Sequence, residues 1–145
     1  MDVQNPPDEV IRSILEQYRH VAVVGLSDQP DRPSYGVAAY LQRAGYTITP
    51  VNPTIRQTLG VAAVPSLEEA PPPLEIVDVF RRPEHVPGVV DQAIALGAKV
   101  VWLQLGIVNE AAAATARAAG LTVVQDRCIF REHQRLLGAR AAPPA

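Results

Sequence analysis

The sequence has little of what several classes of protein require. Its 145 residues include one cysteine, Cys128, which excludes an internal disulfide framework and a cysteine-rich zinc site. No apolar run is long enough to span a bilayer. The segment 1–7 lacks the positive region and apolar stretch of a secretory signal. We therefore expect a cytoplasmic protein that does not enter a membrane.

Neither sign of charge is in large excess. Asp and Glu number 15 and Lys and Arg number 13, which gives a net charge of −2 and argues against nonspecific attraction to nucleic acid. A hydrophobic content of 48% with 19% charged residues is typical of a chain with a packed core. The length matches one domain, so we expect a single domain over 1–145 with flexible ends at 1–7 and 139–145.

Short apolar runs alternate along the chain with apolar residues at helical spacing. The runs are typical of strands buried on both faces, and glycines end several of the helical stretches. A first helix is predicted after Pro6-Pro7, with Ile11, Ile14 and Leu15 on one stripe. The predicted strands are 21–25, 46–51, 74–80, 100–103 and 121–124, and the later predicted helices are 34–44, 86–96 and 110–119. We also expect a short strand within 61–64 and a helical turn at 66–69.

This alternation predicts an α/β doubly wound fold. We expect a mainly parallel, Rossmann-like sheet with helices on both faces. In such open sheets, ligands bind beyond the carboxyl ends of the strands, where the connection order reverses. The loops to inspect are therefore 25–34, 52–53, 80–83, 104–106 and 125–128.

The first of these loops connects a buried strand to a helix. Backbone N–H groups between Gly25 and Ser34, a predicted helix N-cap, can receive a phosphate or pyrophosphate. The loop is not G-x-G-x-x-G, because Leu26 and Ser27 follow the first glycine. Asn52 also stands where an acidic residue would accept ribose hydroxyls. An NAD(P)-binding, oxidoreductase-like protein is thus an alternative, and an ordinary loop is another.

Arginines follow several of the predicted strands. Arg32, Arg81, Arg82 and Arg127 could each make bidentate contacts with phosphate oxygens, although surface ion pairs would also account for any one of them. Phe80, at a strand end, could stack on or cover an adenine or serve as a buried aromatic. The placement of these arginines after predicted strands favours a functional role for at least one of them.

The remaining candidates lie in the last two loops. Gln104 and Gly106 form a turn where a missing side chain lets a ligand approach the backbone, although a plain turn would account for them nearly as well. Cys128 could pair with a ligand thiol, or it could be a small core residue. The three histidines lack metal-site spacing, and no Ser-His-acid arrangement is evident, so no catalytic residue or metal site is predicted.

Five motifs, taken in order, resemble the small stand-alone CoA-binding proteins. They are 24–27 with 30–34, 51–53, 78–82, 102–106 and 126–129. The similarity extends over roughly residues 15–137 and reaches the nucleotide-binding domain of the succinyl-CoA synthetase α subunit. Ligase activity is not implied, because those synthetases also carry a domain with a phosphorylated histidine and need a partner subunit.

The resemblance implies that coenzyme A or an acyl-CoA binds across the strand ends. Residues 25–34 would hold the pyrophosphate, 52–53 would border the ribose phosphate, 79–82 would line the adenine or its phosphates, and 104–106 would border the pantetheine arm. Together with Cys128, the candidate contacts are Gly25, Leu26, Ser27, Arg32, Ser34, Asn52, Pro53, Val79, Phe80, Arg81, Arg82, Gln104 and Gly106.

The main hypothesis is therefore a CoA or acyl-CoA binding module without catalysis of its own. The alternatives are an NAD(P)-binding oxidoreductase-like protein and a thiol or redox protein that uses Cys128 with CoA. We expect no nucleic-acid or membrane partner. The oligomeric state is left open, because the apolar first helix can pack on its own sheet or against a second copy of the chain, which would form a homo-oligomer.

Overall fold

Five parallel strands form the centre of the structure, a computed structural model that describes residues 3–138. The strands are β1 (His20–Val24), β2 (Thr47–Val51), β5 (Ile76–Val79), β6 (Val100–Leu103) and β7 (Thr122–Val124). Their order is β2-β1-β5-β6-β7, and every neighbouring pair is parallel. The chain first builds outward from β1 to β2 and then crosses to β5, so the connection order reverses between β1 and β5.

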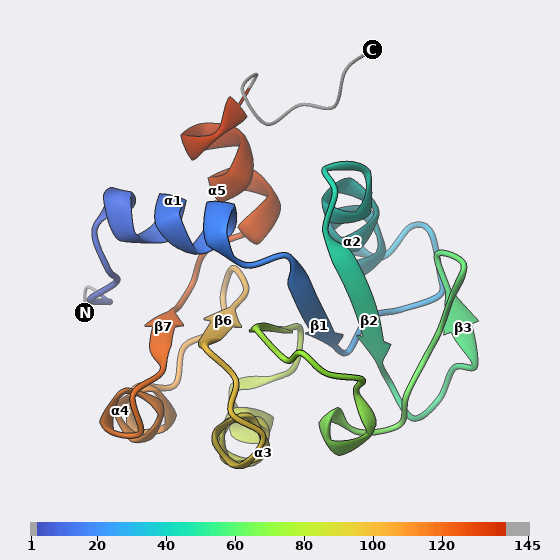
Figure 1. Cartoon of the computed structure of the whole chain (residues 1–145). Coiled ribbons are helices and arrows are strands. Elements are labelled where there is room, and N and C mark those ends of the chain that lie inside the picture. The colour runs from blue at the N-terminus through green and yellow to red at the C-terminus, as the bar shows by residue number, and fades with distance from the viewer. Residues whose placement is uncertain (1–2, 139–145) are drawn as a thin grey trace.

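Helices cover both faces of this sheet (Figure 1), which confirms the predicted doubly wound, Rossmann-like fold. One face carries α1 (Asp8–Gln17), α2 (Pro33–Arg43) and α5 (Ile129–Leu136), and the other carries α3 (Val86–Ala95) and α4 (Glu110–Ala118). The smaller elements are the antiparallel pair β3 (Gln57–Thr58) and β4 (Val61–Ala62), and the 3-10 turns η1 (Leu67–Glu69) and η2 (Pro83–His85).

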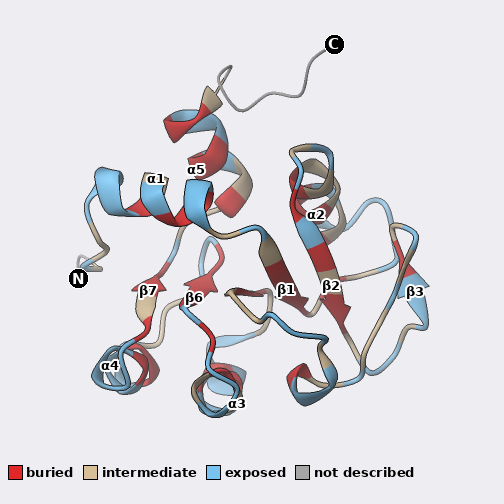
Figure 2. Cartoon of the chain, viewed as in Figure 1, coloured by how far each residue is buried: buried red, intermediate tan, exposed pale blue. Residues whose placement is uncertain are grey.

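Alternate residues of each strand enter two separate hydrophobic cores. In β1, Val21 and Val23 pack beneath α1, α2 and α5, whereas Ala22 and Val24 pack beneath α3 and α4. Figure 2 shows the strands buried and the helices buried on their inner sides. Burial on both faces explains why the strands are continuous apolar runs instead of alternating apolar and polar residues.

Helix α5 was not predicted, because half of its buried face is polar. Its buried residues are Ile129, Glu132, His133 and Leu136, which are spaced as one helical stripe. The Nδ1 atom of His133 lies 2.7 Å from the Tyr40 hydroxyl oxygen. Burial lowers the pKa of His133, so the neutral ring is favoured in the core. A hydrophobic pattern alone does not reveal such a stripe.

Predicted helix caps differ in their outcome. The Asn109 side chain accepts a hydrogen bond from the Ala112 N–H at 3.0 Å, which confirms it as the N-cap of α4. The prediction that Ser34 is the N-cap of α2 is wrong. The N-cap is Arg32, two residues earlier, and the helix begins at Pro33, whose fixed φ suits the first helical position.

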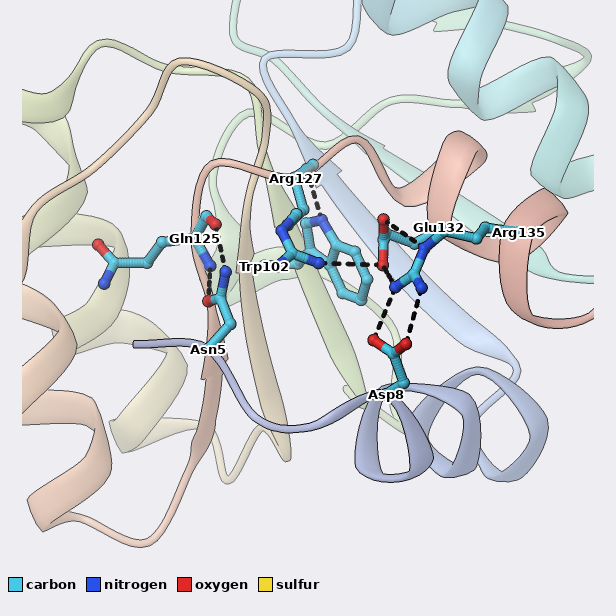
Figure 3. Close-up of polar contacts among 7 residues, drawn as sticks. All are labelled: Asn5, Asp8, Trp102, Gln125, Arg127, Glu132 and Arg135. Carbon is cyan, nitrogen blue, oxygen red and sulfur yellow. Dashed lines mark hydrogen bonds and ion pairs between the residues drawn. The ribbon is translucent and has the colours of Figure 1, made fainter. Parts of the chain in front are cut away.

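The segment before α1 lies along the end of β7. Asn5 donates to the Gln125 carbonyl at 2.9 Å and accepts from the Gln125 N–H at 2.7 Å (Figure 3). Arg117 also donates to the Gln4 carbonyl at 3.2 Å. The Asn5 side chain and the Gln4 carbonyl thus connect residues 4–5 to the end of β7 and to α4, and the flexible end predicted for residues 1–7 stays a prediction. Residues 1–2 and the predicted flexible end at 139–145 lie outside the described residues.

A carboxyl group lies in the middle of the sheet. Asp78 in β5 is fully buried, and its register neighbours are Val23 of β1 and Trp102 of β6. Neither carboxyl oxygen has a hydrogen-bond partner among residues 3–138. Burial raises the pKa of Asp78 well above its ordinary value, so the protonated acid is favoured in the folded state.

We expect Asp78→Asn to make stability less dependent on pH. The folded wild-type chain holds the Asp78 proton more tightly than the unfolded chain does, so its free energy of unfolding falls as pH rises above the ordinary carboxyl range. The amide has no proton to lose. Urea unfolding of both proteins between pH 4 and pH 7.5 measures this, and the variant should gain relative to wild type toward neutral pH. Parallel pH profiles would contradict the assignment.

Candidate functional site at the carboxyl edge of the sheet

The loops that follow β1, β5, β6 and β7 meet at one edge of the sheet and enclose two adjoining hollows. The larger, the main pocket, has a volume of about 620 Å³. Its lining residues are Pro33, Val37, Phe80, Arg81, Arg82, Pro83, Gln104, Leu105, Gly106, Ile107, Cys128 and Arg131. The smaller, the side pocket, has about 220 Å³ and is lined by Gly25, Ser27, Arg32, Pro33, Ser34 and Phe80. Pro33 and Phe80 belong to both.

Gly25 brings the ends of β1 and β5 close together at the point where the connection order reverses. Its φ of +89° favours glycine, and a Cβ atom built there would lie 2.6 Å from the Phe80 carbonyl oxygen. The same Cβ would lie 3.2 Å from Cδ of Arg81, so the arginine stem passes over the glycine. Only a residue without a side chain fits here.

Polar side chains from three elements hold the loop after Gly25. The Ser27 N–H donates to Oγ of Ser34 at 3.0 Å, and the Thr58 hydroxyl donates to the Ser27 carbonyl at 3.1 Å. The Asn52 amide donates to the Leu26 carbonyl at 3.0 Å. Asn52 thus fixes the loop from the end of β2. The β3–β4 hairpin that contributes Thr58 was predicted only in its second strand.

Most of the predicted contact residues line one of the two hollows, and four do not. Leu26 and Val79 are fully buried in the two hydrophobic cores. Asn52 and Pro53 lie outside both linings. The Asn52 amide points toward the loop backbone, where it donates to the Leu26 carbonyl. Arg131 lines the main pocket but escaped prediction because it belongs to α5.

Four arginines around the hollows have no carboxylate partner in the part of the chain that the structure describes. Arg32, Arg81, Arg82 and Arg131 form no ion pair within residues 3–138, and no side-chain hydrogen bond there uses their guanidinium groups. Guanidinium groups favour bidentate contacts with phosphate oxygens. Four guanidinium groups at this edge of the sheet are therefore available to bind an anion.

Arg127, by contrast, is engaged within the protein. Its guanidinium donates to Glu132 at 3.3 Å, and Arg135 joins the same Glu132 at 2.6 Å to Asp8 of α1 (Figure 3). The Arg135 guanidinium lowers the pKa of Asp8 by hydrogen bonding to its carboxylate. The Arg127 carbonyl accepts from Nε1 of Trp102 at 2.8 Å. We predicted that Arg127 could contact a phosphate, but in the structure its guanidinium is already paired with Glu132.

Hydrogen bonds connect the loop after β6 to the turn before α5. Gly106, at φ +83°, donates its N–H to Oδ1 of Asp126 at 2.7 Å. Asp126 itself has a φ of +56°, a strained value for a residue with a side chain. Oε1 of Gln104 accepts from the Ile129 N–H at 3.1 Å. These contacts fix the wall of the main pocket that includes Cys128.

Among residues 3–138, no group of three or more His, Cys, Asp or Glu residues is arranged to hold a metal ion. In the same range, no helix combines the length and apolar character needed to cross a membrane. The distinctive feature is the arginine-lined edge of a doubly wound sheet.

Comparison with known proteins agrees with this architecture. Residues 19–134 match the family described as CoA binding domain. Protein YneT of Bacillus subtilis (strain 168), which is uncharacterised, is 49% identical over 131 residues, 90% of this chain and 97% of that protein. A match that spans most of the chain defines the family. The protein belongs to the CoA-binding domain family.

Solved structures show the same fold. A hypothetical protein from Pyrococcus horikoshii OT3 superposes with a TM-score of 0.89 and 43% identity, covering 95% of this chain and 100% of that one. A Thermus thermophilus protein gives 0.86 and 38%, covering 90% and 99%. The apo dinucleotide-forming acetyl-coenzyme A synthetase 1 of Ca. Korarchaeum cryptofilum gives 0.69 and 21%, covering 79% of this chain and 27% of that one, and shares the fold.

We expect Gly25→Ala to destabilise the protein and Gly36→Ala to stabilise it. A methyl group at position 25 collides with the Phe80 carbonyl and forces an unfavourable φ, a cost on the order of 1–3 kcal/mol. Position 36 lies in α2 with nothing within 4 Å of a new Cβ, so alanine should add about 0.5–1 kcal/mol. Urea unfolding tests both. Equal stability of the two variants would refute the close-approach role of Gly25.

Proposed function

We propose that the protein binds coenzyme A or an acyl-CoA along the main and side pockets, without catalysing a reaction itself. The observation that carries this proposal is a set of four arginines, around an apolar hollow at the carboxyl edge of the sheet, that have no ion-pair partner among residues 3–138. Coenzyme A combines the same two properties, because its nucleotide end carries three phosphates and its pantetheine arm is largely uncharged. Membership of the CoA-binding domain family supports the same ligand.

The side pocket suits the phosphates. It lies at the N-terminus of α2, an 11-residue helix whose positive dipole end favours an anion. Arg32 and the Ser27 hydroxyl contribute donors to the same lining, and Arg81 passes over Gly25 from the neighbouring strand. Donors from two strand ends can thus converge on one pyrophosphate.

The main pocket suits the pantetheine arm. Its walls include the apolar side chains of Val37, Leu105 and Ile107. Leu105 is 60% exposed although its loop is fixed by the hydrogen bond between Gly106 and Asp126. A bound aliphatic chain would cover this leucine and remove apolar surface from water, which favours binding.

An NAD(P)-binding protein is the second candidate. The glycine at position 25 and the N-terminus of α2 would serve a dinucleotide pyrophosphate equally well. Asn52 stands at the ribose position, and its amide is committed to Leu26 while its Oδ1 accepts from Thr54. No acidic acceptor for ribose hydroxyls is therefore present at this position, which favours CoA.

The first test compares melting temperatures with CoA, dephospho-CoA, NAD and NADP at equal concentration. A ligand at one hundred times its Kd adds about 2.7 kcal/mol, which raises Tm by several degrees for a domain of this size. We expect the largest rise with CoA. A rise with NAD or NADP alone would favour the second candidate, and no rise with any of the four would refute both.

Arginine variants test the site itself. Arg131→Ala should weaken CoA binding by about tenfold or more, because a charge-assisted hydrogen bond contributes roughly 1.5–3 kcal/mol. Arg43→Ala is the matched control, since Arg43 is an exposed arginine in the last turn of α2 and lines neither pocket. Calorimetric titration gives both affinities. Equal weakening by the two variants would indicate only a general charge effect.

A further inference from the structure

We propose that Cys128 captures the thiol end of the bound ligand by exchange with a disulfide of coenzyme A, which leaves CoA covalently attached as a mixed disulfide. This inference rests on the proposed CoA binding and adds a reversible covalent step at the same site. Three features of the main pocket support it.

The first feature is the position of the thiol. Cys128 is the single cysteine of the chain, so any disulfide it forms must be with another molecule. It is half-buried and lines the main pocket, directly before the first residue of α5. The thiol therefore borders the hollow in which we place the pantetheine arm.

The second feature is a buried amide with an unused donor. Gln104 is only 4% exposed and lines the main pocket. Its Oε1 is occupied by the Ile129 N–H at 3.1 Å, while its Nε2 donates to no group among residues 3–138. Among the described residues, the fully enclosed side-chain atoms without a hydrogen-bond partner do not include this Nε2, so the donor is reachable from the pocket and is available to a ligand acceptor.

The amide and the thiol lie at the same corner of the pocket. Ile129, which fixes Gln104, is the residue after Cys128, so the hydrogen bond ties the Gln104 side chain to the backbone beside the cysteine. The pantetheine arm carries amide carbonyls a few bonds from its terminal sulfur. A carbonyl that accepts from Nε2 of Gln104 would bring the ligand sulfur near Cys128.

The third feature is that the side pocket, in which we place the pyrophosphate, adjoins the main pocket along the same edge. Gly25, Ser27 and Arg32 line the side pocket, whereas Gln104 and Cys128 line the main pocket. Phe80 belongs to both linings and connects them. A ligand anchored by its phosphates would extend its arm toward the cysteine, which raises the effective concentration of its sulfur there.

The exchange balances without any further oxidant. The Cys128 thiolate attacks one sulfur of the CoA disulfide, that S–S bond breaks, and a new S–S bond joins Cys128 to the bound CoA. The second CoA leaves as a thiolate and takes up the proton that Cys128 released. Excess free thiol reverses the reaction by the same route.

The experiment measures intact mass over time after mixing with CoA disulfide or with oxidised glutathione. We expect the protein to gain the mass of one CoA less two hydrogen atoms, and to lose it again in dithiothreitol. Because binding positions the sulfur, adduct formation with CoA disulfide should be at least tenfold faster than with oxidised glutathione.

Two controls separate a positioned thiol from an exposed one. Cys128→Ser should form no adduct. Adding Leu96→Cys to that variant places the only thiol at a 40% exposed position in the loop after α3, outside both pockets, where the two disulfides should react without preference for CoA. Gln104→Glu keeps an acceptor oxygen for Ile129 but removes the donor, and should reduce the CoA preference of Cys128 up to about tenfold.

The outcomes distinguish this inference from the proposed function. If CoA raises Tm in dithiothreitol but Cys128 forms no adduct, or reacts equally fast with both disulfides, covalent capture is wrong and reversible binding stands. If CoA raises Tm in no condition and no CoA preference exists, both proposals fail. A CoA preference that Gln104→Glu removes supports the full inference.

Discussion

The close approach of Gly25 to the carbonyl of Phe80 is the constraint on which the site depends. It lets β1 and β5 continue side by side to their last residues, where the Phe80 N–H donates to the Val24 carbonyl at 2.8 Å. The loops that leave these two strands then diverge over opposite parts of the edge, toward α2 on one side and η2 on the other. The reversal of connection order creates the hollow, and the missing side chain keeps it open to a ligand.

The distribution of charge follows the same division between structure and site. Arg127 and Arg135 neutralise Glu132 and Asp8, and this network joins α5 to α1 on the face of the sheet that these two helices cover (Figure 3). The arginines that line the pockets have no such partners in the described residues. Because a near-neutral chain has no overall attraction for anions, the local field of these arginines must provide it.

Sequence patterns predicted the sheet well because both of its faces are covered. Burial on two faces requires runs such as Val100–Leu103, and these runs stand out from their surroundings. The positions of the loops followed from that sheet, so the sequence placed Phe80, Gln104 and Cys128 at the edge where they line the main pocket. The pattern failed where a buried face is polar, as in α5, and Arg131 was missed with it.

The direction in which side chains point was the second feature that the sequence did not predict. Val79 precedes Phe80 in the same motif, yet strand alternation sends Val79 into the core beneath α3 and α4 while Phe80 lines both hollows. The role of Asn52 was likewise hidden, because its partner, the Leu26 carbonyl, lies 26 residues earlier in the chain. A motif therefore indicates at which edge of the sheet a residue lies, but not which way its side chain points.

The central claim is that CoA occupies the carboxyl edge between the ends of β1, β5 and β6. The most direct test is an amide chemical-shift titration of the ¹⁵N-labelled protein with CoA under reducing conditions. The account predicts that the largest shifts fall on the amides of residues 25–34, 80–82, 104–107 and 127–131, including Gly25 and Gly106. Saturable shifts confined to the β3–β4 hairpin or to the outer faces of α3 and α4, or no shifts at all, would contradict it.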